Sequence, residues 1–367
     1  MKGIFLHYNS DSVIETSGEV KKVKMQIEAL RLHGIDVKEI CIDKSKRKDC
    51  FTRRIPFYPS SGRNLFKSLL KEDIVNCDFI YIRKYIIDLH FLHVLKKIKE
   101  EAINIKILLE VPTYPYDLEW NRLIDKPILW KERHSRNRLH KYINTIITLS
   151  NDDYIWSIKT IKISNGIDLA KIKPKIKKAQ ESDRIILIGV ALVTKTHGYD
   201  RLIKGLSNYY ESKPEREVEF WLVGTGPEWN NLKDLVSNNK LEEYVKFKGK
   251  KYGRELDDLY DKADIAIGCL GFYRVGIEYG SSLKLREYCA KGIPFIKADK
   301  DRSFDDMNFE YMLEFANDDS DIDISKIVDF YDELQNEKYV GDNMRKYAET
   351  NLTWIKEMKS IVDYIKL

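Results

Sequence analysis

The densest group of residues able to do chemistry lies late in the chain, between residues 271 and 294. There a polar loop with several glycines precedes a short predicted helix. Ser281 and Ser282 are typical helix-capping residues, and Lys284 adds a mobile positive charge in the first turn. Backbone N–H groups at a helix N-terminus bind anions, and Glu287, one turn later, offers an acceptor for hydroxyl groups. The pattern favours a site for a nucleotide diphosphate; a capped helix with solvated charges is the alternative.

Two further glycine segments follow predicted strands. Ser17-Gly18 lies between the first predicted strand and a long helix, so it fits either a phosphate loop or a simple helix cap. Gly224 and Gly226 imitate a dinucleotide-binding fingerprint, but Trp229 stands at the third glycine position. The second segment therefore indicates a tight turn, and hydride transfer is disfavoured.

Composition restricts the class of protein. The 367 residues are 43% hydrophobic and 33% charged, as in a globular protein of about two domains. No run of 18 apolar residues predicts a membrane span, and the N-terminus turns polar at Asn9, too early for a signal peptide. The five cysteines are scattered without metal-ligand spacing, which indicates free thiols in a reducing cytoplasm. We therefore expect a cytoplasmic location.

Charge is uneven along the chain. Residues 1–168 contain 30 Lys and Arg against 22 Asp and Glu, and the remainder contains 33 against 36. A basic first half suits an anionic partner, although solvated lysine-rich faces explain the numbers equally well. No aromatic and basic platform for nucleic acid is present, so we expect no nucleic-acid partner.

Short β-type runs alternate with helical patterns along the chain, which predicts an α/β protein with two doubly wound sheets. Several runs are continuously apolar, as in strands buried on both faces. The predicted strands are 2–7, 36–42, 78–82, 105–110, 144–149, 185–191, 217–223, 244–248, 264–268 and 293–297. The predicted helices are 18–33, 87–100, 199–212, 228–239, 253–261 and 282–291.

The alternation breaks once, at a lysine-rich segment that contains Pro174. We therefore predict four parts: an N-terminal Rossmann-like domain, a linker, a C-terminal Rossmann-like domain and a final helix that packs back toward the first domain. Their bounds are 1–168, 169–183, 184–345 and 346–367. Ligands of such folds bind at the carboxyl ends of the strands.

Several stretches together resemble the retaining GT-B glycosyltransferases of family 4, which build bacterial polysaccharides. The resemblance covers nearly the whole chain, and its motifs are weak singly but specific in this order. They are Ser17-Gly18-Glu19, Tyr81-Ile-Arg83, Glu110 to Asp117, Ser164 to Asp168, His197 to Arg201, Leu222 to Glu228 and Leu283 to Pro294.

The resemblance implies transfer of a sugar from a nucleotide diphosphate sugar to a hydroxyl of a glycan or lipid-linked glycan, with retention of anomeric configuration. Such enzymes act in capsule, O-antigen or exopolysaccharide synthesis. It implies no cofactor and no metal; the DxD-like acids at 319–323 read as a solvated loop. The donor would bind the second domain and the acceptor the first.

Site residues follow from the same resemblance. The proposed catalytic residues are Lys284, Glu287, His197 and Arg274. Lys284, Arg274 and the His197 N–H would stabilise the departing diphosphate, and Glu287 would bind the ribose hydroxyls. Donor-binding residues are Gly18, Lys195, Gly224, Gly249, Lys250, Tyr252, Ser281, Ser282, Leu283, Lys284 and Glu287. Acceptor-binding residues are Arg83, Glu110, Tyr114 and Tyr116, each of which fits ordinary loop packing as well.

Two departures from the family pattern matter. The family commonly carries a Glu-x7-Glu pair; with Glu287 as its second member, the first falls on Tyr279, next to Glu278. An Arg and a Lys near the diphosphate are replaced by Ala191 and His197. A non-catalytic GT-B subunit that supports a partner transferase, or an inverting GT-B enzyme, therefore remains an alternative.

Residues 120–142 combine Trp120, Leu123, Ile128, Leu129 and Trp130 with seven Lys or Arg residues. Such a segment fits a peripheral site on an anionic membrane whose lipid-linked glycan is the acceptor. Packing of the apolar side chains against the first sheet explains it equally well.

Overall fold

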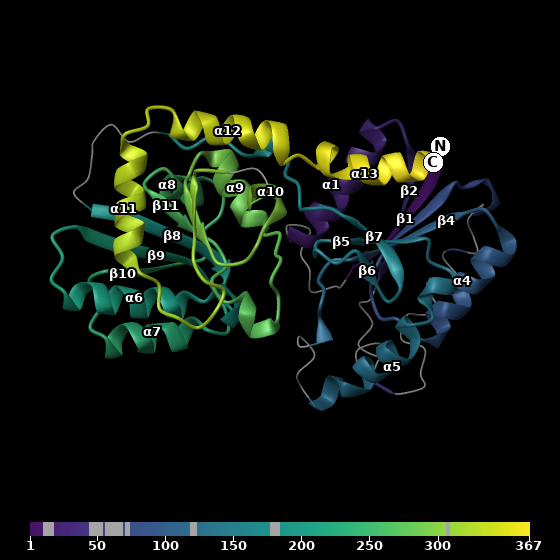
Figure 1. The fold of residues 1–367 in the computed structure, drawn as a ribbon, viewed down its shortest axis with the longest axis horizontal. Helices are drawn as coiled ribbons and strands as arrows, with labels where there is room; N and C mark the ends of the chain where they lie inside the picture. The colour runs from purple at the N-terminus through teal and green to yellow at the C-terminus, as the bar shows by residue number, and fades with distance from the viewer. Residues whose placement is uncertain are drawn as a thin grey trace. The chain divides into compact units, whose positions relative to one another are not determined.

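The computed structural model describes residues 1–9, 18–43, 54–55, 69, 74–117, 123–176, 184–305 and 309–367. The chain divides into two compact domains, each built on a parallel sheet (Figure 1). The first domain contains Met1–Gly166 and Trp354–Leu367, and the second contains Ile167–Thr353. The predicted α/β class with two doubly wound sheets is confirmed.

The first sheet has the strand order β2-β1-β3-β4-β5-β7-β6, and only β6 runs antiparallel to its neighbour. Its strands are β1 Lys2–Asn9, β2 Asp36–Asp43, β3 Phe79–Arg83, β4 Lys106–Val111, β5 Thr145–Thr148, β6 Tyr154–Ile155 and β7 Ile158–Lys162. The helices are α1 Gly18–Leu32, α4 Leu89–Glu101, α5 Lys126–Arg136 and α13 Trp354–Lys366. The hairpin of β6 and β7 and helix α5 were not predicted as elements from the sequence.

Alternating side chains of the strands bury both faces of the first sheet. Phe5 packs with α1 and α13 on one face, whereas Ile4 and Leu6 pack with α4 on the other. Because neighbouring strand residues point to opposite faces, a strand buried on both sides must be apolar at nearly every position. This explains the continuous apolar runs.

The second sheet has the order β10-β9-β8-β11-β12-β13 and is wholly parallel. Its strands are β8 Arg184–Leu192, β9 Glu217–Thr225, β10 Val245–Gly249, β11 Ile265–Ile267, β12 Phe295–Lys297 and β13 Met312–Glu314. The helices are α6 Tyr199–Glu211, α7 Trp229–Asn238, α8 Arg254–Tyr260, α9 Leu283–Lys291, α10 Arg302–Asp305, α11 Ile324–Gln335 and α12 Val340–Asn351. Helices α6, α7 and α11 cover one face, and α9 and α12 cover the other.

The domain bounds differ from those expected. The C-terminal segment forms two helices, with α12 in the second domain and α13 on α1 in the first, so the chain returns at 353/354 instead of 345/346. The chain first passes from one domain to the other between Gly166 and Ile167. A Cβ on Gly166 would lie 2.5 Å from the backbone nitrogen of Trp354, so only glycine fits there. The described part of the predicted linker contacts the second domain, since Lys175 N–H donates to Lys291 O over 2.8 Å.

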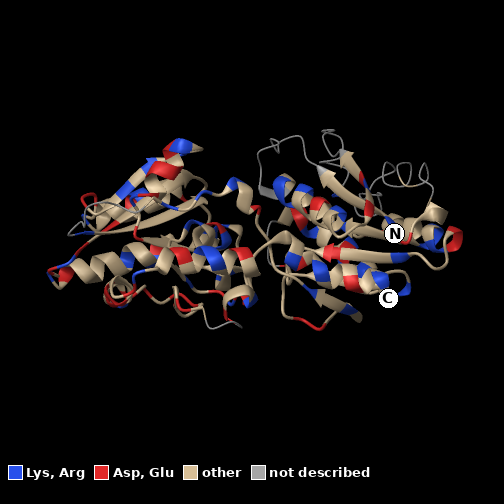
Figure 2. Ribbon diagram, turned by 90° about the horizontal axis from the view of Figure 1, so that it is seen from above, with Lys and Arg blue, Asp and Glu red and all other residues tan. Residues whose placement is uncertain are grey.

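Figure 2 shows Lys and Arg interspersed with Asp and Glu along the ribbon of each domain. Among the helices of the described segments, none is long and apolar enough to cross a bilayer.

Candidate functional site

The candidate site lies at the carboxyl end of the second sheet, where β8 leads into the 3₁₀ turn η6 (Lys195–His197) and then into α6. Gly198, between the turn and the helix, has φ of +63°. A Cβ there would lie 2.6 Å from the backbone of Leu270, so the segment after β11 packs directly on this turn. Glycine is therefore required for the two loops to meet.

His197 has a defined tautomer. Its Nδ1 accepts a hydrogen bond from the N–H of Thr194 at 3.2 Å, so Nδ1 carries no proton and Nε2 is the donor. Burial, together with the nearby charge of Lys284, lowers the pKa of the imidazole to about 3. His197 is therefore neutral at physiological pH, and it both caps the turn and presents an N–H donor.

Lys284 lies in the first turn of α9. The sequence analysis predicts a mobile positive charge there, but the ammonium group is enclosed by the protein. The Nζ atom is buried and has no hydrogen-bond partner within the described segments. It lies 5.9 Å from the ring centroid of Tyr199, and burial lowers its pKa. A buried ammonium without an acceptor is costly, so this position is prepared for a bound anion.

The N-terminus of α9 also differs in detail from the expected cap. Ser282 occupies the N-cap position but makes no side-chain hydrogen bond to the helix backbone. The first N–H groups of a helix have no partner within it. Ser281, Ser282 and Leu283 thus lie at a helix N-terminus, where an anion is favoured; their binding of the donor stays a prediction.

Arg274 does not offer its charge to the site. Its two terminal nitrogens pair with both carboxylate oxygens of Asp200 at 2.8 and 2.7 Å, Nη1 also donates to Lys195 O, and Nε donates to Tyr273 Oη. The side chain therefore fastens the turn η7 (Phe272–Val275) to η6 and α6. In this arrangement Arg274 positions the loop, and the catalytic role predicted for it stays a prediction.

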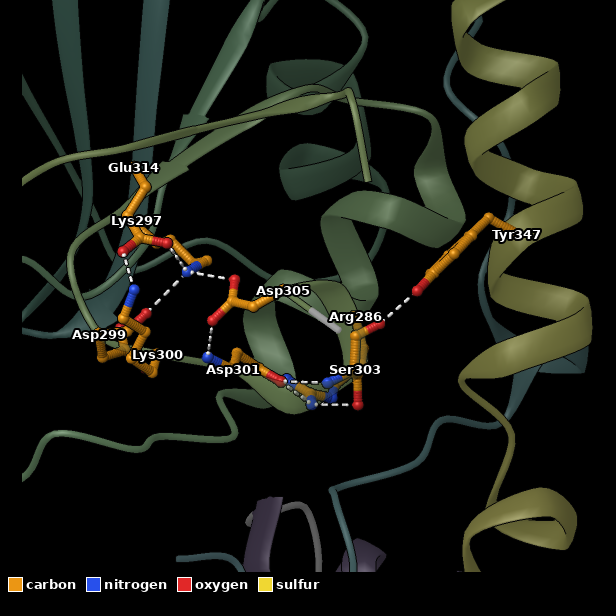
Figure 3. A network of polar contacts seen from close by, with 9 residues as sticks. All are labelled: Arg286, Lys297, Asp299, Lys300, Asp301, Ser303, Asp305, Glu314 and Tyr347. Atoms are coloured by element: carbon orange, nitrogen blue, oxygen red, sulfur yellow. Dashed lines mark hydrogen bonds and ion pairs between the residues drawn. The ribbon is translucent and has the colours of Figure 1, made fainter. Parts of the chain in front are cut away.

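Glu287 is half-buried on α9, beside the phenol groups of Tyr260 and Tyr288. Its neighbour Arg286 is fully buried and forms a bidentate ion pair with Asp301, with one contact of 2.7 Å (Figure 3). This pair ties α9 to the loop after β12 and holds the helix that carries Lys284 and Glu287.

The glycines at the strand ends are structural. Gly224 has φ of +130°, and a Cβ there would lie 1.8 Å from Ala191 O, so it lets β8 and β9 end side by side. Gly249 is also left-handed, with φ of +67°, and ends the edge strand β10. Beyond it, Lys250 and Tyr252 are exposed, as is Lys195 in η6, and Gly18 is the first residue of α1.

In the first domain, Arg83 Nη1 donates a hydrogen bond to Glu110 Oε1 over 2.7 Å. Glu110 also contacts Lys22 at 3.1 Å, Tyr81 Oη at 2.8 Å and Gln26 at 3.2 Å. Burial opposes its ionisation, but the Lys22 and Arg83 charges prevail and lower the pKa of the carboxyl to about 2. The two predicted acceptor residues therefore join α1 to β3 and β4 instead of reaching outward.

The two tyrosines predicted for the acceptor lie beside Trp156. Tyr114 and Tyr116 each meet its ring edge-on at 6.2 Å. Tyr116 Oη also donates to buried Glu132, whereas Tyr114 is half-buried and more accessible. Trp156 lies in the hairpin between β6 and β7, which the sequence analysis missed because two-residue strands carry no periodic signal.

Sequence reasoning also missed Asp299 and Tyr199. The carboxylate of Asp299 and the hydroxyl of Tyr199 are buried, and no described residue is hydrogen-bonded to either. Asp299 comes two residues after a predicted strand. Because ligands bind at the carboxyl ends of parallel strands, this position could have marked Asp299 as a candidate site residue. Burial and the neighbouring Asp301 raise the pKa of Asp299 to about 7.

Part of the chain matches a known protein family. Residues 182–318 match the model of the family described as "Glycosyl transferases group 1". No curated protein sequence matches the chain significantly.

Among solved structures, a sucrose-phosphate synthase from Thermosynechococcus elongatus is similar with a TM-score of 0.66 and 13% identity, covering 100% of this chain and 98% of that one. HepE of Anabaena, in complex with UDP, has a TM-score of 0.63 and 14% identity over the whole of both chains. The lipopolysaccharide outer core galactosyltransferase WaaB has a TM-score of 0.57 and 14% identity, again over both whole chains.

The fold is GT-B. The matched family segment begins just before β8 and ends before α11, so it contains η6, α9 and the loop after β12. The family match lies within the second domain, and the similarity to solved structures shows the fold of the whole chain. The polar groups of the second domain described above lie within the matched segment.

Proposed function

We propose that the protein transfers a sugar from a nucleoside diphosphate sugar to a hydroxyl of a glycan or lipid-linked glycan, with retention at the anomeric carbon and without a metal ion. UDP is the proposed nucleotide, since HepE was solved with UDP and with UDP-glucose. Synthesis of a bacterial surface polysaccharide is the proposed setting; WaaB, a lipopolysaccharide galactosyltransferase, shares the fold.

One observation carries this proposal: the buried, unpartnered ammonium of Lys284 at the N-terminus of α9. In sugar transfer the leaving diphosphate gains negative charge as the glycosidic bond breaks. Fixed N–H dipoles and an enclosed cation stabilise that charge more strongly than solvated groups do. Lys284, the neutral His197 and the α9 backbone provide such donors on one side of the domain.

The test begins with thermal unfolding in the presence of UDP, GDP, dTDP, CMP or NAD, each with and without magnesium. A ligand at one hundred times its Kd stabilises the native state by about 2.7 kcal/mol. We expect stabilisation by UDP that does not depend on magnesium. Stabilisation by NAD alone, or by no diphosphate, would contradict the proposal.

Turnover is then measured with UDP-sugars and glycan acceptors, and the anomeric configuration of the product is read by NMR. Lys284→Met should lower kcat by at least about 100-fold, as for loss of one preorganised charge-stabilising group. Lys204→Met, which changes an exposed lysine on α6, is the matched control and should retain activity. A wild-type chain that binds the donor without turnover would favour the non-catalytic subunit.

We also propose that the exposed face of α5 and its flanks rests on an anionic lipid surface. Leu123, Ile124 and Trp130 expose 78%, 57% and 48% of their surface. The exposed charged residues between 123 and 141 are all basic: Lys126, Arg133, Arg138 and Lys141. The two acids of this segment are turned inward, with Asp125 paired to Arg54 and Glu132 buried against Lys84. Exposed apolar side chains and unbalanced basic charge therefore occur in the same short segment.

Sedimentation with liposomes tests this surface. We expect binding to phosphatidylglycerol-containing vesicles, no binding to phosphatidylcholine vesicles, and loss of binding in the Leu123→Glu, Trp130→Glu double variant. Val75→Glu, at a residue exposed by 69% elsewhere on the domain, is the control. Equal sedimentation of the double variant and the wild type would contradict the assignment.

A further inference from the structure

Asp299 is a buried acid that the proposed phosphate site does not explain. It lies two residues after β12 and is completely buried, and neither carboxylate oxygen accepts a hydrogen bond from another residue of the described segments. Buried carboxylates in folded proteins ordinarily accept several hydrogen bonds, because an unpaired one costs several kcal/mol at the order-of-magnitude level. The exception at Asp299 requires an explanation.

The cations around Asp299 are engaged with other acids (Figure 3). Lys297 Nζ pairs with Asp305 at 2.8 Å and Glu314 at 2.9 Å, and it donates to the main-chain oxygen of Asp299, also at 2.8 Å. Lys300 pairs with Glu314 at 2.9 Å, while Arg286 pairs with Asp301. The side-chain carboxylate of Asp299 is left out of this network.

The carboxylate of Asp299 lies instead beneath the loop that precedes α9. Oδ2 is 2.0 Å from the place a Cβ would take on Gly280, so a side chain there would displace the carboxylate. The backbones are joined as well, since Gly280 N–H donates to Lys300 O at 2.8 Å and Lys300 N–H donates to Glu278 O at 2.9 Å. Gly280 thus leaves space for the acid next to the anion-binding end of α9.

Asp299 has a counterpart of opposite charge in Lys284. The two groups interact electrostatically, and each also interacts with the thiol of Cys269, yet neither hydrogen-bonds to the other. A buried cation and a buried anion near the same thiol, both unpartnered, would gain from a ligand that accepts from the ammonium and donates to the carboxylate. A sugar phosphate has this chemistry, because its phosphate oxygens accept and its hydroxyls donate.

We propose that Asp299 binds a hydroxyl of the donor sugar while Lys284 binds the phosphate to which that sugar is attached. This inference rests on the proposed function and adds to it a residue that selects the sugar part of the donor. Because both groups are enclosed, residues 276–282 must move aside as the donor enters. UDP without a sugar reaches Lys284 and leaves Asp299 unused.

The experiment compares affinities for UDP and for UDP-glucose, UDP-galactose and UDP-N-acetylglucosamine by calorimetry. For the UDP-sugar that the wild type binds most tightly, Asp299→Asn should raise Kd at least tenfold, while Kd for UDP should change less than twofold. Gly280→Ala, which displaces the carboxylate without removing it, should give the same selective loss. Glu278→Gln, at an exposed acid of the same loop, is the matched control and should change neither affinity.

Equal weakening of UDP and UDP-sugar by Asp299→Asn in a variant with cooperative thermal unfolding would overturn the inference and leave the proposed function intact. Unchanged affinities in Asp299→Asn, or a selective loss in Glu278→Gln, would do the same. A wild type that binds neither UDP nor any of these UDP-sugars would overturn both.

Discussion

Each domain buries a carboxylate beside cations, but the two arrangements are opposite in hydrogen bonding. In the first domain, Glu110 contacts four donor side chains within 3.2 Å. In the second, Asp299 and Lys284 interact through space, and neither has a hydrogen-bond partner among the described residues. The first arrangement is complete, whereas the second lacks the groups that would satisfy it.

The comparison separates stability from binding. A buried carboxylate that accepts from several donors holds elements together, here α1 against β3 and β4. An unsatisfied pair costs stability in the free protein and recovers that cost when a ligand binds. We therefore propose that ligand binding depends on Lys284 and Asp299. The sequence analysis did not name Asp299, and it assigned Glu110 and Arg83 either to the acceptor or to ordinary loop packing.

The largest expected effect is on the complete network. Glu110→Ala leaves Lys22 and Arg83 buried without their shared anion, so the free energy of unfolding should fall by about 3–5 kcal/mol. Urea unfolding measures the change. Glu100→Ala removes an exposed helical ion pair with Lys96 and should cost less than about 0.5 kcal/mol. If Glu110→Ala lowered the free energy of unfolding by less than about 1 kcal/mol, the buried network of the first domain would not have the stabilising role described above.

The second prediction uses the opposite pKa shifts of the two acids. The pKa of Asp299, about 7, exceeds its ordinary value, so the native state holds the extra proton between about pH 4 and 7. Wild-type stability therefore falls across that range, and Asp299→Asn should be more stable than wild type by roughly 4 kcal/mol at pH 8 but similar near pH 4. Glu110, with a pKa of about 2, stabilises above pH 4.5 and loses this contribution as pH falls toward 2.

Unfolding of Asp299→Asn, Glu110→Gln and wild type between pH 3 and 8 measures both trends. The stability difference between Asp299→Asn and wild type should grow as pH rises, and the deficit of Glu110→Gln should shrink as pH falls. Parallel curves for all three proteins would show that neither carboxyl is perturbed as described.

The third prediction concerns Lys284. Lys284→Met removes a buried ammonium without an acceptor and keeps an apolar side chain, so the free protein should gain about 1 kcal/mol of stability. The same change should abolish stabilisation by UDP. Thermal unfolding with and without UDP gives both quantities, with Lys204→Met as control. A destabilised variant that still responds to UDP would indicate that the ammonium serves the fold.

The smallest expected effect is at Arg274. Arg274→Ala and Asp200→Ala each break the same half-buried ion pair and should each cost about 0.5–1 kcal/mol, while the double variant should cost little more than either single one. Nucleotide affinity should change in parallel in all three. If Arg274→Ala alone abolished UDP binding, Arg274 would contact the diphosphate directly, as the sequence had suggested.

Most strands and helices were predictable because they depend on the order of apolar and polar residues along short segments. The ten predicted strands and six predicted helices are present in the structure, with bounds that differ by a few residues. The strands β6, β7 and β13 and the helices α5 and α11 were missed, since strands of two to five residues or half-polar helices carry weak periodicity. The predicted single C-terminal helix is two helices because Leu352 and Thr353 pair with Ile167 at the domain crossing.

The sequence by itself determined the α/β class, the two sheets, the placement of Lys284 and Glu287 on one short helix, and the glycines that end strands. Those features follow from residue type and spacing along a few turns. Only the tertiary structure decided which charges are paired: Arg274 with Asp200, Arg83 with Glu110, and Asp299 with no described residue. These two ion pairs join residues 74 and 27 positions apart. Burial, which makes an unpaired charge costly, exists only once the sheets and helices have packed.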